Sequence, residues 1–189
     1  MDKFSTPAAL VIAGLLCACS ASTQRKLEGR VFDIPKLHNI SDSDAPFFLP
    51  ALNPQDGFSF YLNPEAARPD RNLIEVASKM RMCARAAGTE ARINSTVCAA
   101  LSMSWRGLSL HKVSDGVFWT YDLPTAAEQK SPASLASCFV LSGDSQSGLC
   151  TASLPYGNLV LTIHFRDDQI ASLEPLYDQS IAKLRRWER

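Results

Sequence analysis

Leu159-Val-Leu-Thr-Ile-His-Phe-Arg166 is the stretch that decides the fold, because every second side chain from Leu159 to Phe165 is apolar. Side chains point alternately to the two faces of an extended strand, so these apolar residues share one face. Thr162 and His164 lie on the other face. A strand with one apolar face is typical of an antiparallel sheet whose second face is in water. The pattern therefore predicts a half-buried strand.

A hairpin is predicted immediately upstream, because two strand-like runs flank the turn-rich segment 142–148. If the turn is centred near Asp144, Cys138 and Cys150 lie opposite each other. Residues opposite each other in antiparallel strands have Cα atoms about 4.5–5.5 Å apart, a distance that a disulfide can bridge.

Downstream, residues 169–189 are predicted to be helical and to lie across the sheet. Apolar side chains recur there at three- and four-residue spacings and form one stripe: Ile170, Leu173, Tyr177, Ile181 and Leu184. Pro175 fits best in the first turn of a helix, which leaves residues 168–173 as a separate short turn. Asp167 and Asp168 are interpreted as caps of this helical segment.

Further strands are expected in five segments: residues 29–34, 57–62, 71–82, 107–113 and 117–123. The inward residues of segment 71–82 are Ile74, Val76, Met80 and Met82. A helix through this segment is the alternative, but its apolar spacing is less regular. The last two segments form a hairpin around Gly116, which suits a backbone position with positive φ. Its inner face is expected to hold Leu108, Leu110, Val117, Trp119, Tyr121 and Leu123. The elements together predict an α+β fold, a mainly antiparallel sheet with a C-terminal helix packed on one face, stabilised by disulfides.

The N-terminus has the features of an export signal. Asp2 and Lys3 are followed by an apolar run, residues 8–16, which has the length of a secretory core and is too short to span a bilayer. The next residues, Leu16-Cys17-Ala18-Cys19, resemble the lipobox of bacterial lipoproteins. The resemblance implies that residues 1–18 are removed as a signal peptide and that Cys19 becomes the lipidated N-terminus, carrying palmitate or a similar acyl chain. The alternative is an ordinary cleaved signal with incidental cysteines.

Composition and length predict the organisation of the mature chain. Residues 20–27 are small and polar and cannot bury enough surface to fold, so residues 19–27 are expected to form a lipidated, flexible tether. Residues 28–189 have the length of a single domain. Ser20 is a non-acidic residue after the lipidated cysteine, which in bacterial lipoproteins implies sorting to the outer membrane. The protein is therefore expected in the bacterial periplasm, held to a membrane by lipid.

Four cysteines remain after the leader, and in an exported chain an even number indicates disulfides. The sequential pairing, Cys83 with Cys98 and Cys138 with Cys150, is favoured by geometry. A metal site is the alternative, but no C-x-x-C spacing is present. The chain has 19 basic and 19 acidic residues. This balance gives no electrostatic reason to bind nucleic acid.

A search for catalytic or metal-binding motifs gives little. No H-E-x-x-H, glycine-rich phosphate loop or calcium loop is present, so no metal and no cofactor are expected. Residues 143–148 superficially resemble the nucleophile block of GDSL lipases, but they lie too late in the chain. A cryptic enzyme built around Ser145 and His164 remains an alternative hypothesis. His164 itself is interpreted as a solvated strand histidine.

Two surface features are candidates for contact with a protein partner. Phe47 and Phe48 are neighbours in a proline-rich loop, where they cannot both point inward. Lys79, Arg81 and Arg85 form a basic strip that could meet an acidic protein face. The alternatives are a loop that folds under its own prolines and an ordinary solvated strand face.

The layout of the whole chain, with a lipobox, a tether and a disulfide-bearing α+β domain without catalytic motif, resembles lipoprotein immunity proteins of type VI secretion phospholipase effectors. The resemblance implies a non-enzymatic protein, the antitoxin of a toxin–antitoxin pair, that binds and neutralises a secreted lipase. The alternative is a structural or assembly lipoprotein of the bacterial envelope.

Overall fold

The computed structural model describes residues 22–40, 57–88, 105–107, 109–124, 134–140 and 148–189. Within these residues the strands form a two-stranded sheet and a seven-stranded antiparallel sheet with the order β3-β4-β9-β8-β7-β6-β5. The strands of the larger sheet are β3 (Gly57–Tyr61), β4 (Leu73–Ser78), β5 (His111–Asp115), β6 (Phe118–Asp122), β7 (Ser134–Phe139), β8 (Leu149–Tyr156) and β9 (Leu159–Arg166). The predicted α+β architecture is confirmed.

Strand β9 lies inside the sheet, between β4 and β8. Its alternating apolar residues are almost completely buried, as the sequence predicts, and Ile163 is 0% exposed. The turn between β8 and β9 places Gly157 at a φ of +60°, a conformation that glycine adopts without steric cost. This interior strand thus contributes its apolar side chains to the inner face of the sheet.

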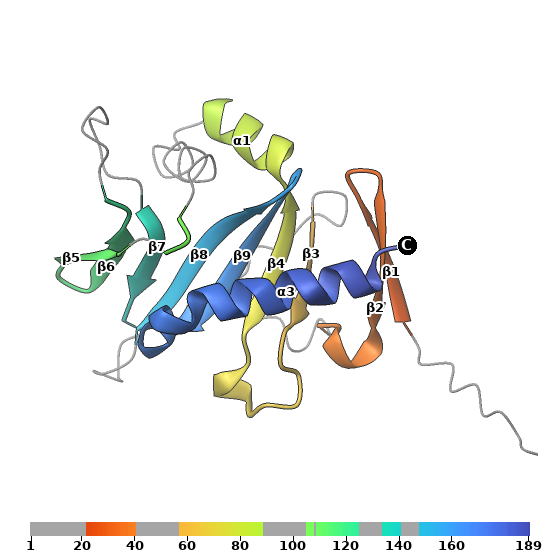
Figure 1. Ribbon diagram of the computed structural model, residues 1–189, viewed down its shortest axis with the longest axis horizontal. Coiled ribbons are helices and arrows are strands. Elements are labelled where there is room, and N and C mark those ends of the chain that lie inside the picture. The colour runs from red at the N-terminus through yellow and green to blue at the C-terminus, as the bar shows by residue number, and fades with distance from the viewer. Residues whose placement is uncertain (1–21, 41–56, 89–104, 108, 125–133, 141–147) are drawn as a thin grey trace, which may run out of the picture.

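Helix α3 (Leu173–Trp187) covers that inner face (Figure 1). It follows a 3-10 segment, η3 (Asp167–Ser172), so Pro175 lies in the first turn, as expected from its missing N–H. Leu173, Tyr177 and Leu184 of the predicted stripe are buried, and Ile170 and Ile181 pack against the core. None of the described helices is long and apolar enough to cross a membrane.

The predicted flexible tether is wrong for residues 22–27, which form strand β1 (Ser22–Leu27) paired with β2 (Arg30–Pro35). Glu28 and Gly29 both have positive φ, as a two-residue type I′ hairpin turn requires. The composition of this segment misleads because backbone pairing, and not side-chain burial, holds most of the strand. Leu27 alone is buried, at 3% exposure.

Segment 71–82 is only partly a strand. β4 ends at Ser78, and helix α1 (Lys79–Gly88) begins at once, so the prediction that Met80 and Met82 continue the inward face is wrong. The backbone N–H of Arg81 donates to the Ser78 hydroxyl at 3.1 Å, a side-chain contact that favours the start of a helix. Met80 is 69% exposed. Two short 3-10 turns, η1 (Lys36–His38) and η2 (Arg68–Asp70), complete the described elements.

Candidate protein-binding site

The β5–β6 hairpin forms one end of the large sheet (Figure 1). Asp115 and Phe118 face each other across its turn, where Gly116 has a φ of +63°, so the predicted hairpin is confirmed. The inward placement of Val117 is wrong, because this residue is 59% exposed. Val117 is the second residue of the two-residue turn, and therefore lies beyond the last paired position and away from the core.

Three large apolar side chains of this hairpin are exposed. Val113 is 52% exposed, Val117 59% and Phe118 62%. The Phe118 ring touches the sheet through Phe139, at 6.5 Å between ring centroids. Exposed apolar residues that cluster on one element are typical of interaction surfaces, whereas isolated ones are ordinary.

The inner side of the same hairpin is buried, as predicted for Trp119, Tyr121 and Leu123. Leu110 packs against the core at its margin, and Leu108 lies outside the described residues. The position of the Trp119 ring is restricted by Gly148. A Cβ atom at Gly148 would lie 2.1 Å from this ring, so a larger residue there would displace it.

Asp167 joins the hairpin to the body of the protein. Its carboxylate accepts hydrogen bonds from Trp119 Nε1 at 2.8 Å and from the Tyr121 hydroxyl at 2.7 Å, both to Oδ1. Lys112 Nζ donates to Oδ2 at 3.1 Å and lies 4.6 Å from the Trp119 ring centroid. The interpretation of Asp167 as a helix cap is therefore wrong, because the hairpin occupies its oxygens.

The electrostatics of this contact favour the ionised carboxylate. Burial raises the pKa of Asp167, but hydrogen bonds from Tyr121, Trp119 and Lys112 outweigh it and leave the pKa below its usual value. The pKa of Tyr121 is raised by burial and by its hydrogen bond to Asp167. Tyr121 therefore remains the donor and Asp167 the acceptor over the whole physiological pH range.

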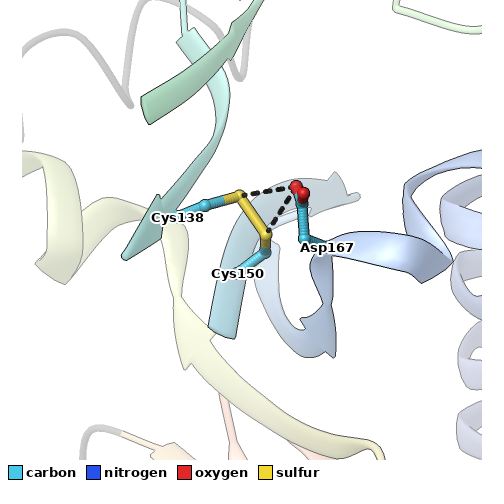
Figure 2. Close-up of side chains that lie close together, drawn as sticks. All are labelled: Cys138, Cys150 and Asp167. Atoms are coloured by element: carbon cyan, nitrogen blue, oxygen red, sulfur yellow. Dashed lines mark hydrogen bonds between the residues drawn. A yellow bond between two sulfur atoms is a disulfide. The ribbon is translucent and has the colours of Figure 1, made fainter. Parts of the chain in front are cut away.

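The Cys138–Cys150 disulfide lies directly against this carboxylate (Figure 2). The two cysteines face each other across β7 and β8 with Cα atoms 4.0 Å apart, which confirms the predicted pairing. Their sulfurs lie 3.8 and 3.7 Å from Asp167 Oδ1. A disulfide sulfur carries no proton, so these are packing contacts, and the joined sulfurs offer no thiolate to a metal ion.

A cleft of about 340 Å³ opens beside the base of the hairpin. Its walls present both polar and apolar surface and come from the hairpin side, from η3 and from the start of α3. They include Trp105, Leu110, Tyr121, Ile170, Leu173 and Glu174. The Trp105 ring is held edge-on to Tyr177, at 5.5 Å between centroids. The cleft could receive an apolar side chain of a partner that contacts the hairpin.

His164 is not the solvated residue that its isolation in the sequence suggests. Its Nε2 lies 2.5 Å from Glu75 Oε1 of the neighbouring strand, and only 11% of its side chain is exposed. Within the described residues its buried Nδ1 has no hydrogen-bond partner. The prediction fails because β9 lies inside the sheet, where even its polar face is largely covered. Ser145, the expected nucleophile of a cryptic enzyme, lies outside the described residues.

The remaining predicted site residues are only partly described. Lys79, Arg81 and Arg85 lie in helix α1, so the basic residues do not form a strand face. Cys83 is also in α1 and is disulfide-bonded. Four further predicted residues lie outside the described ranges: Cys19, Phe47, Phe48 and Cys98.

Sequence reasoning left Val113 and Phe118 off the inner face of the hairpin but did not single them out as candidate contact residues. A signal for Phe118 was present, because Phe118 and Trp119 are neighbours on a strand and must point to opposite faces. Only Trp119 could join the inner face. The contribution of Asp167 had no local signal, since its partners are distant in the chain.

Comparison with known proteins gives little about function. No known protein family matches the chain, and no curated protein matches it. One solved structure that matches is an immunity protein of the Stenotrophomonas maltophilia type IV secretion system. The match has a TM-score of 0.43 and 11% identity, and it covers 90% of this chain and 94% of that chain. Similarity at this level supports no conclusion, so the function must be inferred from the site.

Proposed function

We propose that this protein is a non-enzymatic, exported lipoprotein that binds and neutralises a partner protein. The partner we propose is a secreted lipase toxin, of the kind delivered by type VI secretion. The observation that carries the proposal is the β5–β6 hairpin, which combines an exposed apolar surface with a rigid connection to the core.

The rigid connection matters because ordering a flexible loop costs free energy on binding. Here the hairpin is already held by three donors on one carboxylate, that of Asp167. Pre-organised apolar and aromatic residues are typical of the few positions that contribute most of the affinity of an interface. Val117 and Phe118, at the tip, are the residues that we expect to enter the partner.

Export and lipidation complete the proposal. The Cys138–Cys150 disulfide supports an oxidising compartment, because disulfides form and persist outside the reducing cytoplasm. In that compartment acylated Cys19 would hold the domain against a membrane, and we propose the periplasmic face of the outer membrane. The inhibitor would then be concentrated beside the phospholipid that the toxin attacks.

The mechanism that we propose is occlusion. Lipases must admit a lipid acyl chain, so the entrance to their active site is apolar. An apolar hairpin tip fits such an entrance, and the adjacent cleft at Trp105 and Tyr121 can accept a side chain from its rim. Inhibition then requires only tight binding, and no chemistry on the lipase.

An inhibition assay tests the proposal. Lipase toxins encoded in the same genome are mixed with the purified protein, and phospholipid hydrolysis is measured. We expect one of them to lose its activity at an equimolar ratio of inhibitor. The Phe118→Asp variant should weaken inhibition at least about tenfold, the loss expected for one important interface residue.

Met80→Asp is the matched control, because Met80 is also an exposed large apolar residue but lies on α1, outside the hairpin. It should inhibit as the native protein does. Undiminished hydrolysis by every such lipase in excess inhibitor would overturn the proposed function. Stable binding of a resident envelope protein instead would favour an assembly lipoprotein.

A further inference from the structure

Among the residues that the structure describes, no strand pairs with the outer edge of β5. Within the described residues only β6 pairs with β5, and all of its side chains are exposed. An exposed edge presents a row of backbone N–H and C=O groups that can pair with a strand of another chain. The question is which strand fits this edge.

The groups that point outward follow from the hairpin register. In a two-residue hairpin the pair that closes the turn, here Asp115 and Phe118, exchanges hydrogen bonds, and bonded and non-bonded pairs then alternate. The Val140 N–H donates to the Val117 carbonyl at 3.2 Å on the other side of β6, which agrees with this assignment. Lys112 and Ser114 therefore direct their backbone groups away from β6, toward solvent.

We propose that β5 pairs antiparallel with β5 of a second copy of this chain, with Val113 opposite itself on a two-fold axis. In this register Lys112 lies opposite Ser114 of the second copy. These are the residues whose N–H and C=O groups point outward, so the backbone donors and acceptors match without any shift. The two sheets would join into one continuous sheet.

The side chains are complementary in the same register. His111 lies opposite Asp115 of the second copy, and the pair is repeated on the other side of the axis. An imidazole N–H donates to a carboxylate, and opposite partners on facing strands stabilise the pairing. Between these pairs, Val113 packs against Val113 of the second copy, and the contact would cover the side chain that is exposed in the single chain.

Lysine on an edge strand usually discourages pairing, because its charge projects over the edge. Lys112 does not do so here. Its ammonium group turns inward to Asp167 and the Trp119 ring. At Lys112 the outer edge of β5 therefore presents only backbone groups. Val117 and Phe118, at the tip of the hairpin, do not take part in this pairing and stay available for a different partner.

Charge substitution at the two-fold axis tests this pairing. Sedimentation velocity of the purified full chain is expected to show a monomer–dimer equilibrium that shifts to dimer as concentration rises. Val113→Lys alone and Val113→Glu alone should each weaken the dimer at least about tenfold, because like charges then face each other. An equal mixture of the two variants should restore it.

Ser114→Pro removes an outward N–H and should also give monomer, while Ser114→Ala keeps that N–H and should remain dimeric. Near-ultraviolet circular dichroism, to which the buried Trp105, Trp119 and Trp187 contribute, checks that each variant is folded. A native chain that stays monomeric at all concentrations, or a dimer that persists in both Val113 variants, would overturn the proposal. Lipase inhibition is measured separately, by phospholipid hydrolysis, and does not depend on whether the protein is a monomer or a dimer.

Discussion

The two edges of the seven-stranded sheet differ in what covers them. At the β3 edge, Phe60 is 0% exposed and forms a β-bridge to Asn39, and its ring meets Trp187 edge-on at 4.9 Å. At the β5 edge every side chain of the strand is exposed. Within the described part of the chain, the same sheet thus ends once in a buried, covered strand and once in an exposed strand with a free outer edge.

The covered edge is closed by both ends of the described chain. Arg30 of β2 forms a bidentate ion pair with Glu188, at 2.6 and 2.5 Å, and donates to the Tyr156 hydroxyl at 2.9 Å. The Arg189 N–H donates to the Val31 carbonyl. These contacts fix β2 and the C-terminus to each other and to β8. We propose that recognition takes place at the opposite end of the large sheet, in the β5–β6 hairpin.

The largest effect on the free energy of unfolding is expected for a substitution at the covered β3 edge. Phe60→Ala removes a completely buried ring that contacts Trp187, and should lower the free energy of unfolding by about 3–5 kcal/mol. Phe118→Ala, at the exposed edge, should change it by less than about 1 kcal/mol, because the ring is mostly in solvent. Urea denaturation of both variants measures the difference. Equal losses would contradict the contrast between the edges.

The second prediction concerns the disulfide beneath the hairpin. Replacing Cys138 and Cys150 together by serine opens a loop with a sequence separation of 12. It should lower the free energy of unfolding by roughly 3 kcal/mol, as expected for cross-links of this loop length. The loss is measured by urea denaturation without reductant. The native protein with dithiothreitol should show a loss at least as large, because the reductant also opens the disulfide of Cys83. No change in either measurement would contradict the prediction.

A smaller effect is expected at the carboxylate that joins the exposed hairpin to the core. Asp167→Asn keeps the shape but removes the charge that Lys112, Trp119 and Tyr121 contact, and should cost about 1–3 kcal/mol of unfolding free energy. Asp168→Asn is the matched control, because Asp168 is largely exposed and pairs only with Arg166 among the described contacts. It should have little effect in the same urea titration.

The stabilisation that the Asp167 carboxylate provides is also expected to depend on pH. The pKa of Asp167 is lower in the native protein than its usual value, despite burial, because of its hydrogen bonds. The ionised carboxylate therefore stabilises the fold above about pH 4, and this stabilisation is lost as the pH falls through the native pKa. The difference in stability between the native protein and Asp167→Asn should shrink below about pH 4. A difference that stays constant down to pH 2 would contradict the assignment.

The smallest effect is expected for the ion pair at the surface of the hairpin. Lys112 is 47% exposed, and its contact with Asp167 is accordingly screened by solvent. Lys112→Met should lower the free energy of unfolding by no more than about 1 kcal/mol. Thermal unfolding at low and high salt measures it. A loss as large as that of Asp167→Asn would show that Lys112, rather than the two aromatic donors, holds the hairpin.

The spacing of apolar residues and cysteines along the sequence correctly predicted those parts of the fold that involve only one element or two neighbouring elements. The alternation in β9, the stripe on α3 and the position of Cys138 opposite Cys150 all follow from residues within one or two elements. β1 was missed because its polar residues are extended only through pairing with β2. α1 was missed because alternation continues in the sequence after Ser78, where the backbone turns into a helix.

The candidate site was harder to predict than the fold. Asp167 contacts residues 46, 48 and 55 positions earlier in the chain, and no spacing rule connects such positions. Whether an edge strand is covered also depends on distant elements. Phe60 and Val113 both lie on edge strands, yet the first is buried by the C-terminus and the second is open.

The measurement that most directly tests the hairpin as the recognition element is amide hydrogen exchange, with and without the lipase that we propose the protein inhibits. We predict slower exchange at the hairpin tip, residues 115–118, on binding, with β1 and β2 unchanged. Slower exchange confined to α1 or to the β3 edge, with the hairpin tip unchanged, would contradict this account.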